Sequence, residues 1–136
     1  MANVEVLVAT AEREVYRGVA DFLVAPGAAG ELGIMPNHTP LLSALTAGEL
    51  RIHRGEEVDE VFISGGFLEV QPDMITVLAD TAERASDVDE ASAAEAERKA
   101  QEAVDEHKGD VDYARAAAEL SIAAARLAFL RKRKRK

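Results

Sequence analysis

An abrupt change of sequence pattern near Glu83 restricts the possible folds more than any other feature. Before it, short apolar segments are separated by glycine, proline and aspartate turn signals, about every 8 to 12 residues. After it, alanine, glutamate, lysine and arginine dominate, and proline is absent. The first pattern indicates a sandwich or barrel and the second indicates helices. We therefore predict an α+β chain with a β-domain over residues 1–85 and a helical segment over residues 86–136.

Alternation of apolar residues marks the strands of the first part. Val4, Val6 and Val8 recur at every second position, which predicts a strand with one buried face. Gly18 is expected to separate two strands. Further predicted strands cover residues 14–18, 19–25, 30–35, 40–45, 48–54, 58–64, 67–70 and 75–79.

The second part predicts two helices separated by a stop signal. The first helix is expected from Val88 to His107 with Asp87 as its N-cap, and the second from Val111 to Leu130. Gly109 fits the left-handed position after a helix, so the short connection predicts an antiparallel hairpin. The facing residues are mostly alanines, which bury little apolar area at ~25 cal/mol per Å². We expect a weakly held, movable hairpin; a permanently packed one is the alternative.

The stretch from Gly30 to Ile52 concentrates glycine and proline. Pro36 and Pro40 each fix φ and remove a backbone donor, and His38 lies between them in the run Pro-Asn-His-Thr-Pro. Such a rigid turn between strands predicts a surface presented to a partner.

Composition excludes several kinds of site. The chain has no cysteine, so disulfides, thiolate metal sites and cysteine nucleophiles are absent. The net charge is −9, but the last six residues contribute +6, so residues 1–130 sum to −15. This acidic body argues against nucleic-acid binding, and we expect neither a signal peptide nor a membrane span. The basic tail either contacts an acidic or phosphate-bearing partner or is a solvated helix end.

Catalytic motifs are not evident. The three histidines form no metal-binding pattern, and no phosphate-binding loop or nucleophile elbow is present. An enzyme that uses His38 and Glu31 as an acid–base pair is one alternative to consider. We expect a chain without its own active site.

Three segments carry a resemblance to a known family. They are GELGIMPNHTPLLSAL at 30–45, SGGFLEVQPDMITVLADTAERA at 64–85 and GDVDYARAAAEL at 109–120. In their order and spacing the chain resembles the epsilon subunit of the bacterial F-type (rotary) ATP synthase. The resemblance implies a ten-stranded β-sandwich followed by an antiparallel two-helix hairpin.

The resemblance also implies a role and partners. It implies a non-catalytic rotor subunit of the central stalk in proton-translocating ATP synthase, peripheral on the cytoplasmic face of the cell membrane. The sandwich would bind the gamma subunit and the polar loops of the c-ring, with Glu31 and His38 in the interface. The hairpin would move between a compact state and an extended state. When extended it would contact the alpha and beta subunits and block ATP hydrolysis.

The basic end of the second helix suggests how the extended state is held. Pairing of this end with acidic residues of the beta subunit would favour extension by electrostatics. The residues expected to make this inhibitory contact are Arg126, Arg131, Lys132 and Arg133.

Some family members bind ATP at the compact hairpin, and this chain matches their motif only in part. Glu83, Asp89 and Arg126 fit the motif. Ser92 and Ile122 stand where arginines are expected. Because charge-assisted guanidinium contacts dominate phosphate binding, we expect weak or no ATP binding and no other cofactor.

A different class of function is the remaining alternative. A stand-alone β-sandwich adaptor with a coiled-coil tail would bind another protein with the same two kinds of element. Co-purification with the gamma subunit discriminates between this adaptor and the rotor subunit.

Overall fold

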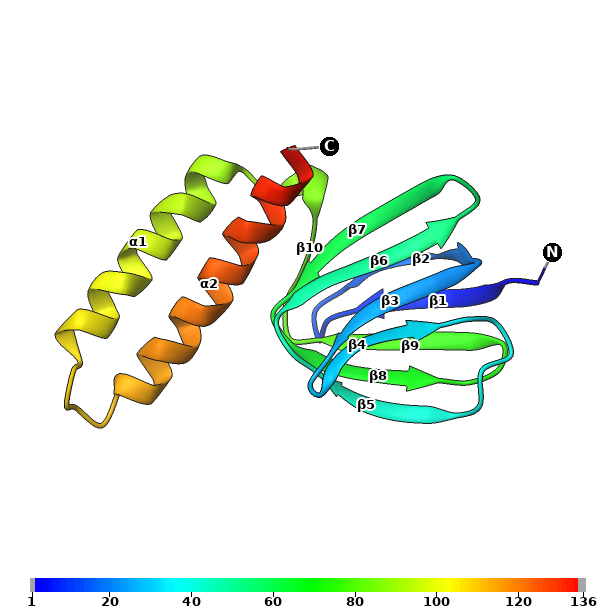
Figure 1. The fold of residues 1–136 in the computed structure, drawn as a ribbon, viewed down its shortest axis with the longest axis horizontal. Helices are drawn as coiled ribbons and strands as arrows, with labels where there is room; N and C mark the ends of the chain where they lie inside the picture. Colours follow the sequence, from blue (N-terminus) through cyan, green and yellow to red (C-terminus); the bar gives the residue numbers. More distant parts are fainter. Residues whose placement is uncertain (1, 135–136) are drawn as a thin grey trace. The chain divides into compact units, whose positions relative to one another are not determined.

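The computed structural model describes residues 2–134, which fold into two compact units that divide between Ala85 and Ser86 (Figure 1). The first unit holds ten strands, as the resemblance implied. They are β1 (Val4–Ala9), β2 (Glu14–Ala20), β3 (Phe22–Gly27), β4 (Gly30–Ile34), β5 (Leu41–Leu45), β6 (Gly48–Arg54), β7 (Glu57–Ile63), β8 (Gly66–Val70), β9 (Met74–Ala79) and β10 (Ala82–Arg84).

The ten strands form one continuous sheet that folds over into two layers. The order is β10-β7-β6-β3-β5-β8-β9-β1-β2, with β4 paired to the edge of β3. β3 and β5 share a single residue pair, Gly27 with Leu45, so the sheet bends there. At the other end β2 comes back against β6 and β10, and the sandwich nearly closes into a barrel. All pairings are antiparallel except β1 with β9.

The core lies between the two layers and is aliphatic. Val4, Val6 and Val8 are all buried, which confirms the predicted face of β1. Residues at alternate positions of the other strands complete it, including Leu23, Ile34, Leu50, Ile52, Ile63, Leu68, Ile75 and Val77. Burial of such side chains is the main favourable term for this unit.

One strand prediction is wrong. Gly18 does not separate two strands, because it pairs with Val6 inside the continuous strand β2, and the chain turns only at Asp21. Gly66 has a more specific role at the start of β8. Its φ is +145°, and a Cβ there would lie 2.2 Å from the carbonyl oxygen of Leu78. Only glycine tolerates that backbone and that approach.

The second unit holds α1 (Glu90–Glu106) and α2 (Tyr113–Lys134), preceded by a 3-10 turn at Ala85–Asp87. The predicted cap Asp87 is wrong, because Asp89 caps α1. Its carboxylate accepts from the backbone N–H groups of Ala91 and Ser92. Asp87 lies in a turn of 3-10 helix, so the α-helix begins later than predicted.

The helices run antiparallel and pack side by side, as predicted (Figure 1). Gly109 adopts a φ of +78° in the connection, and Val104 and Ala116 are buried. α2 extends beyond Leu130 into the basic residues, since lysine and arginine are good helix formers. Within residues 2–134, neither helix is long and apolar enough to cross a bilayer.

Candidate interaction surfaces

Glu31 lies near the start of β4, beside the turn that follows β3. Its side chain is 63% exposed, and its Oε1 lies 3.2 Å from Nη2 of Arg51 on β6. Nη1 of Arg51 lies 3.1 Å from Oε1 of Glu49. Partial burial works against a charged guanidinium, but the hydrogen bond to Glu49 and the charge of Glu31 outweigh it and raise the pKa of Arg51. This arrangement orients an exposed carboxylate on the sheet surface.

His38 lies in the loop after β4, beyond the end opposite to Glu31. Its Nδ1 lies 2.6 Å from the carbonyl oxygen of Thr39. The adjacent Asn37 has a φ of +63° and donates its N–H to the carbonyl of Pro72 at 2.9 Å, which ties the loop to the β8–β9 turn. Glu31 is paired with Arg51 and the His38 ring with the carbonyl of Thr39, and among the described residues no hydrogen bond or ion pair joins Glu31 to His38 as an acid–base pair would need.

An exposed apolar face covers β5, β8 and β9, and the sequence did not reveal it. Leu42, Phe67 and Leu78 are 72%, 56% and 58% exposed, and we refer to these three residues as the outer face. Phe67 pairs directly with Leu78 on β9 and with Ala44 on β5. Paired residues of neighbouring strands point to the same side, so these side chains form one surface. Leu42 lies two positions from Ala44 on the same side of β5 and pairs with Glu69, so this surface combines exposed apolar side chains with a charged one. Exposed apolar patches rimmed by polar residues mark interaction sites.

The residues of the partial ATP motif are distributed over both units. Glu83 lies on β10 in the first unit, whereas Asp89 and Arg126 lie in the second. The Asp89 carboxylate is engaged at the start of α1, where the backbone N–H of Ser92 lies 3.3 Å from Oδ2. Ile122 and Arg126 are both half-buried on α2. No guanidinium stands at either substituted position.

The basic end of α2 is partly engaged within the hairpin. Nε of Arg131 lies 3.6 Å from Oε1 of Glu90 at the start of α1. Arg131 and Lys132 are exposed. The side chain of Arg133, the fourth residue of the predicted inhibitory contact, lies outside the described part of the chain. Arg131 is exposed and Glu90 is half-buried, and a pair at the protein surface contributes about 1 kcal/mol, so this contact can be exchanged for another.

Comparison with known proteins gives the same division of the chain. Residues 3–85 match the family model for the ATP synthase delta/epsilon chain beta-sandwich domain, and residues 86–130 match its long alpha-helix domain. A protein of Acidithiobacillus ferridurans, named ATP synthase epsilon chain, is 53% identical over 92% of this chain and 89% of its own length. A protein of Nitrosomonas eutropha with the same name is 50% identical over 95% of this chain and 94% of its own length.

Solved structures show the same fold. A chain in the cryo-EM structure of the Euglena gracilis mitochondrial ATP synthase, which contains OSCP, F1 and the c-ring, superposes with a TM-score of 0.82. It is 19% identical, and the match covers 96% of this chain and 82% of that chain. A chain in the Tetrahymena thermophila central stalk and c-ring structure has a TM-score of 0.51 at 22% identity, over 61% of this chain and 67% of that one.

Proposed function

Because the chain belongs to the ATP synthase delta/epsilon chain family, we propose that it is a non-catalytic rotor subunit of the central stalk. In this role it couples the catalytic head to the c-ring, and its C-terminal helices inhibit ATP hydrolysis. Its partners are the gamma subunit, the polar loops of the c-ring and, when the hairpin extends, the alpha and beta subunits. The complex holds it at the cytoplasmic face of the membrane without a span of its own.

The outer face is the observation that carries this proposal. Leu42, Phe67 and Leu78 expose apolar surface on a rigid sheet. An aromatic side chain flanked by aliphatic ones is a common centre of a protein interface. We assign this face to the gamma subunit, because a rotor subunit must be fixed to the rotating shaft.

Binding to purified gamma subunit tests this assignment. Phe67→Ala should weaken binding by about 30-fold, the change that a loss of about 2 kcal/mol at a central contact produces. Val58→Ala is the matched control, since Val58 is a 42% exposed apolar residue on β7. Equal affinity of the Phe67→Ala variant and the wild type would remove the outer face from the interface. Failure of the wild type to bind gamma would instead support a stand-alone adaptor.

Glu31 and His38 are proposed to meet the c-ring as two separate contacts. Glu31 lies near the start of β4 and His38 lies in the loop after its end, so each needs its own test. The absence of cysteine makes a single introduced thiol unique in the chain. Glu31→Cys and His38→Cys, each paired with a cysteine in the c-ring loop, should cross-link in assembled enzyme. If only one of the two variants cross-links, the c-ring contact is assigned to that position.

Inhibition is proposed to use the basic end of α2. The Arg131–Glu90 pair belongs to the hairpin in which α1 and α2 lie side by side. If the helices separate on extension, the guanidinium becomes available to acidic residues of the beta subunit. Arg126, Lys132 and Arg133 supply further positive charge along the same helix. One exposed ion pair is thereby exchanged for several at an interface, where desolvation strengthens them.

A further inference from the structure

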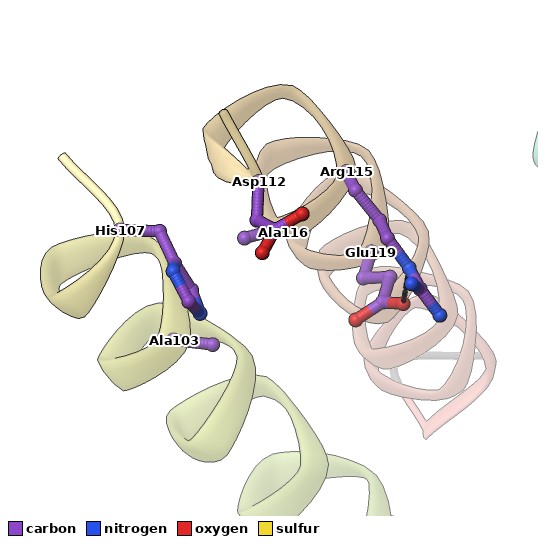
Figure 2. A pocket seen from close by; sticks show the side chains of 6 residues that line it. All are labelled: Ala103, His107, Asp112, Arg115, Ala116 and Glu119. Carbon is purple, nitrogen blue, oxygen red and sulfur yellow. Dashed lines mark ion pairs between the residues drawn. The ribbon is translucent and has the colours of Figure 1, made fainter. Parts of the chain in front are cut away.

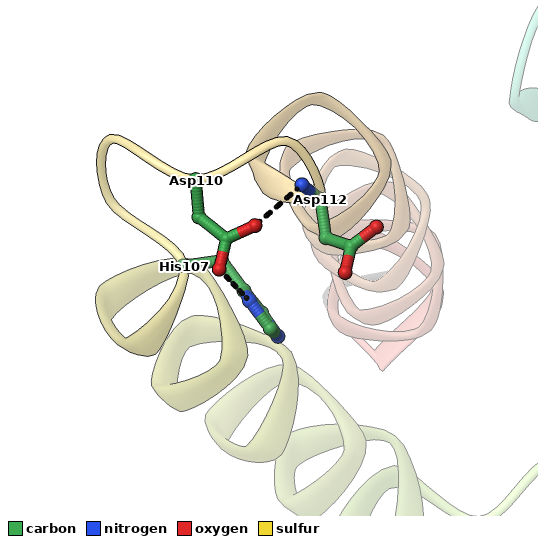
Figure 3. A group of neighbouring side chains, drawn as sticks. All are labelled: His107, Asp110 and Asp112. Atoms are coloured by element: carbon green, nitrogen blue, oxygen red, sulfur yellow. Dashed lines mark hydrogen bonds and ion pairs between the residues drawn. The ribbon is translucent and has the colours of Figure 1, made fainter.

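The turn between α1 and α2 brings together three side chains of metal-ligating types, His107, Asp110 and Asp112 (Figure 3). One potential ligand atom from each lies within 4.8 Å of the others. His107 ends α1, whereas both aspartates immediately precede α2. The positive φ of Gly109 permits the chain reversal that places the two helix ends together. The cluster therefore depends on the hairpin and not on sequence adjacency alone.

His107 and Asp110 already have the separation of two ligands on one ion. Nδ1 of His107 lies 3.3 Å from Oδ2 of Asp110. A tetrahedral ion with bonds of about 2.1 Å holds neighbouring ligand atoms about 3.4 Å apart. The other oxygen of Asp110, Oδ1, accepts from the backbone N–H of Asp112 at 2.9 Å. The contact between Oδ2 and Nδ1 is a hydrogen bond in this structure, so a bound ion would replace that contact while Oδ1 keeps its bond to Asp112.

Asp112 supplies the third ligand from beside a pocket between the helices (Figure 2). The pocket has a volume of about 220 Å³ and is lined by Ala103, His107, Asp112, Arg115, Ala116 and Glu119. Asp112 is exposed, and we expect a change of its side-chain rotamer to bring its carboxylate to the ion. Arg115 is the guanidinium among the described residues that line the pocket, and it lies 3.5 Å from the carboxylate of Glu119. Its charge is balanced, and the aspartates leave the turn negative.

We propose that His107, Asp110 and Asp112 bind a divalent first-row transition-metal ion of the Zn²⁺ class. One imidazole nitrogen with two carboxylate oxygens suits such ions, whereas Mg²⁺ and Ca²⁺ prefer oxygen ligands alone. Three protein ligands leave a fourth position to water. The ion joins the end of α1 to the start of α2, so binding stabilises the hairpin by mass action. The site does not depend on the proposed role of the chain in a complex.

Calorimetric titration of the untagged full-length chain with ZnCl₂ tests the proposal. The wild type should bind one ion, and MgCl₂ should give no comparable heat. His107→Ala and Asp112→Asn should each weaken binding about tenfold or more, since even outer-shell partners of metal ligands contribute roughly 10- to 100-fold. His53→Ala is the control, because His53 lies on β6 in the first unit, and it should bind as the wild type does.

Asp110→Asn keeps the test valid if another variant disturbs the turn. Asparagine supports the same kind of turn as aspartate, so this variant retains an oxygen that accepts from the backbone N–H of Asp112 and loses the charged ligand. It should fold with wild-type helicity and bind the ion at least about tenfold more weakly. Circular dichroism should show a ZnCl₂-dependent rise in the helix melting temperature of the wild type and of the His53→Ala control, and a smaller rise or none in Asp110→Asn. Absence of Zn²⁺ binding, or binding that His107→Ala leaves unchanged, would overturn the proposal.

Discussion

The guanidinium of Arg51 holds the carboxylate of Glu31, with 3.2 Å between Nη2 and Oε1. The two residues are far apart in sequence and meet because β4 and β6 flank β3. Glu31 pairs with Pro26 on β3 and Arg51 pairs with Val24, two positions away on the same face. Two strand spacings of about 4.8 Å separate β4 from β6, a distance that two long side chains can bridge.

The two partners of this ion pair should differ in their contribution to stability. Arg51→Met should lower the free energy of unfolding by about 1–3 kcal/mol, because Glu49, only 11% exposed, loses a charged hydrogen-bond donor. Glu31→Gln should cost less than about 1 kcal/mol, since that carboxylate is largely solvated. Urea unfolding monitored by circular dichroism measures both. An equal loss of unfolding free energy in the two variants would show that the bond from Arg51 to the largely buried Glu49 adds no stability.

Two leucines on neighbouring strands should separate stability from binding. Leu68 on β8 is fully buried, whereas Leu78 on β9 is 58% exposed. Leu68→Ala should lower the free energy of unfolding by about 2–5 kcal/mol through the cavity that it leaves. Leu78→Ala should change it by less than about 0.5 kcal/mol but weaken binding to the gamma subunit. Wild-type gamma affinity in a folded Leu78→Ala variant would contradict the assignment of the outer face.

Removal of residues 131–136 should raise ATP hydrolysis by the assembled enzyme. The truncation removes six positive charges that we propose bind the beta subunit in the extended state. Replacement of all six residues by alanine keeps the length of the chain and removes only the charges. It should therefore raise ATP hydrolysis as the truncation does. Moderate salt should mimic the truncation by screening. Inhibition that persists in both variants would exclude the tail from the mechanism.

The isolated chain should not bind ATP with micromolar affinity, and arginine substitution should restore binding. The double variant Ser92→Arg and Ile122→Arg places guanidinium groups where ATP-binding relatives have them. Ser121→Arg adds one guanidinium at an exposed neighbouring position and should have no effect. Isothermal titration with MgATP distinguishes the variants. Micromolar binding by the wild type would show that the two missing arginines are dispensable.

An ion pair on α1 should make the stability of the hairpin depend on pH. The hydrogen bond from Arg98, with Nε 3.1 Å from Oε2, lowers the pKa of Glu95 below its ordinary value of 4.5. A depressed carboxyl pKa stabilises the folded state above pH 4.5, and this contribution is lost as the pH falls through the folded-state pKa.

Substitution tests the source of that dependence. Glu95→Gln should reduce the acid-induced loss of helix stability, which thermal melts followed by circular dichroism at several pH values would show. Glu106→Gln removes another exposed carboxylate from the same helix and is the control. A steeper or unchanged acid dependence in Glu95→Gln would contradict the assignment to this pair.

Local signals predicted most of the fold. Alternation of Val4, Val6 and Val8 identified β1, and Gly109 identified the reversal between the helices. The cap of α1 was misplaced because Asp87 and Asp89 are both good capping residues. Only the backbone, which places Asp87 in a 3-10 turn and Asp89 in an extended conformation, decides between them.

The candidate surfaces were less predictable than the elements that carry them. Glu31 and His38 were identified in one segment, but most of β4 lies between them. Sequence spacing does not show reliably at which residue an element ends. The outer face was missed because Phe67 and Leu68 are both apolar. Their adjacency shows that they point to opposite sides of β8 without showing which side is covered.

The sequence by itself determined the strand and helix periods, the change between them and the family, because these depend on backbone geometry and local side-chain pattern. Only the tertiary structure decided that Phe67 is exposed while Leu68 is buried, and that Arg51 reaches Glu31 across β3. These outcomes depend on the order in which distant strands pair and on how the sheet folds over. A pairing between residues remote in sequence is a property of the assembled sheet, and no single strand encodes it.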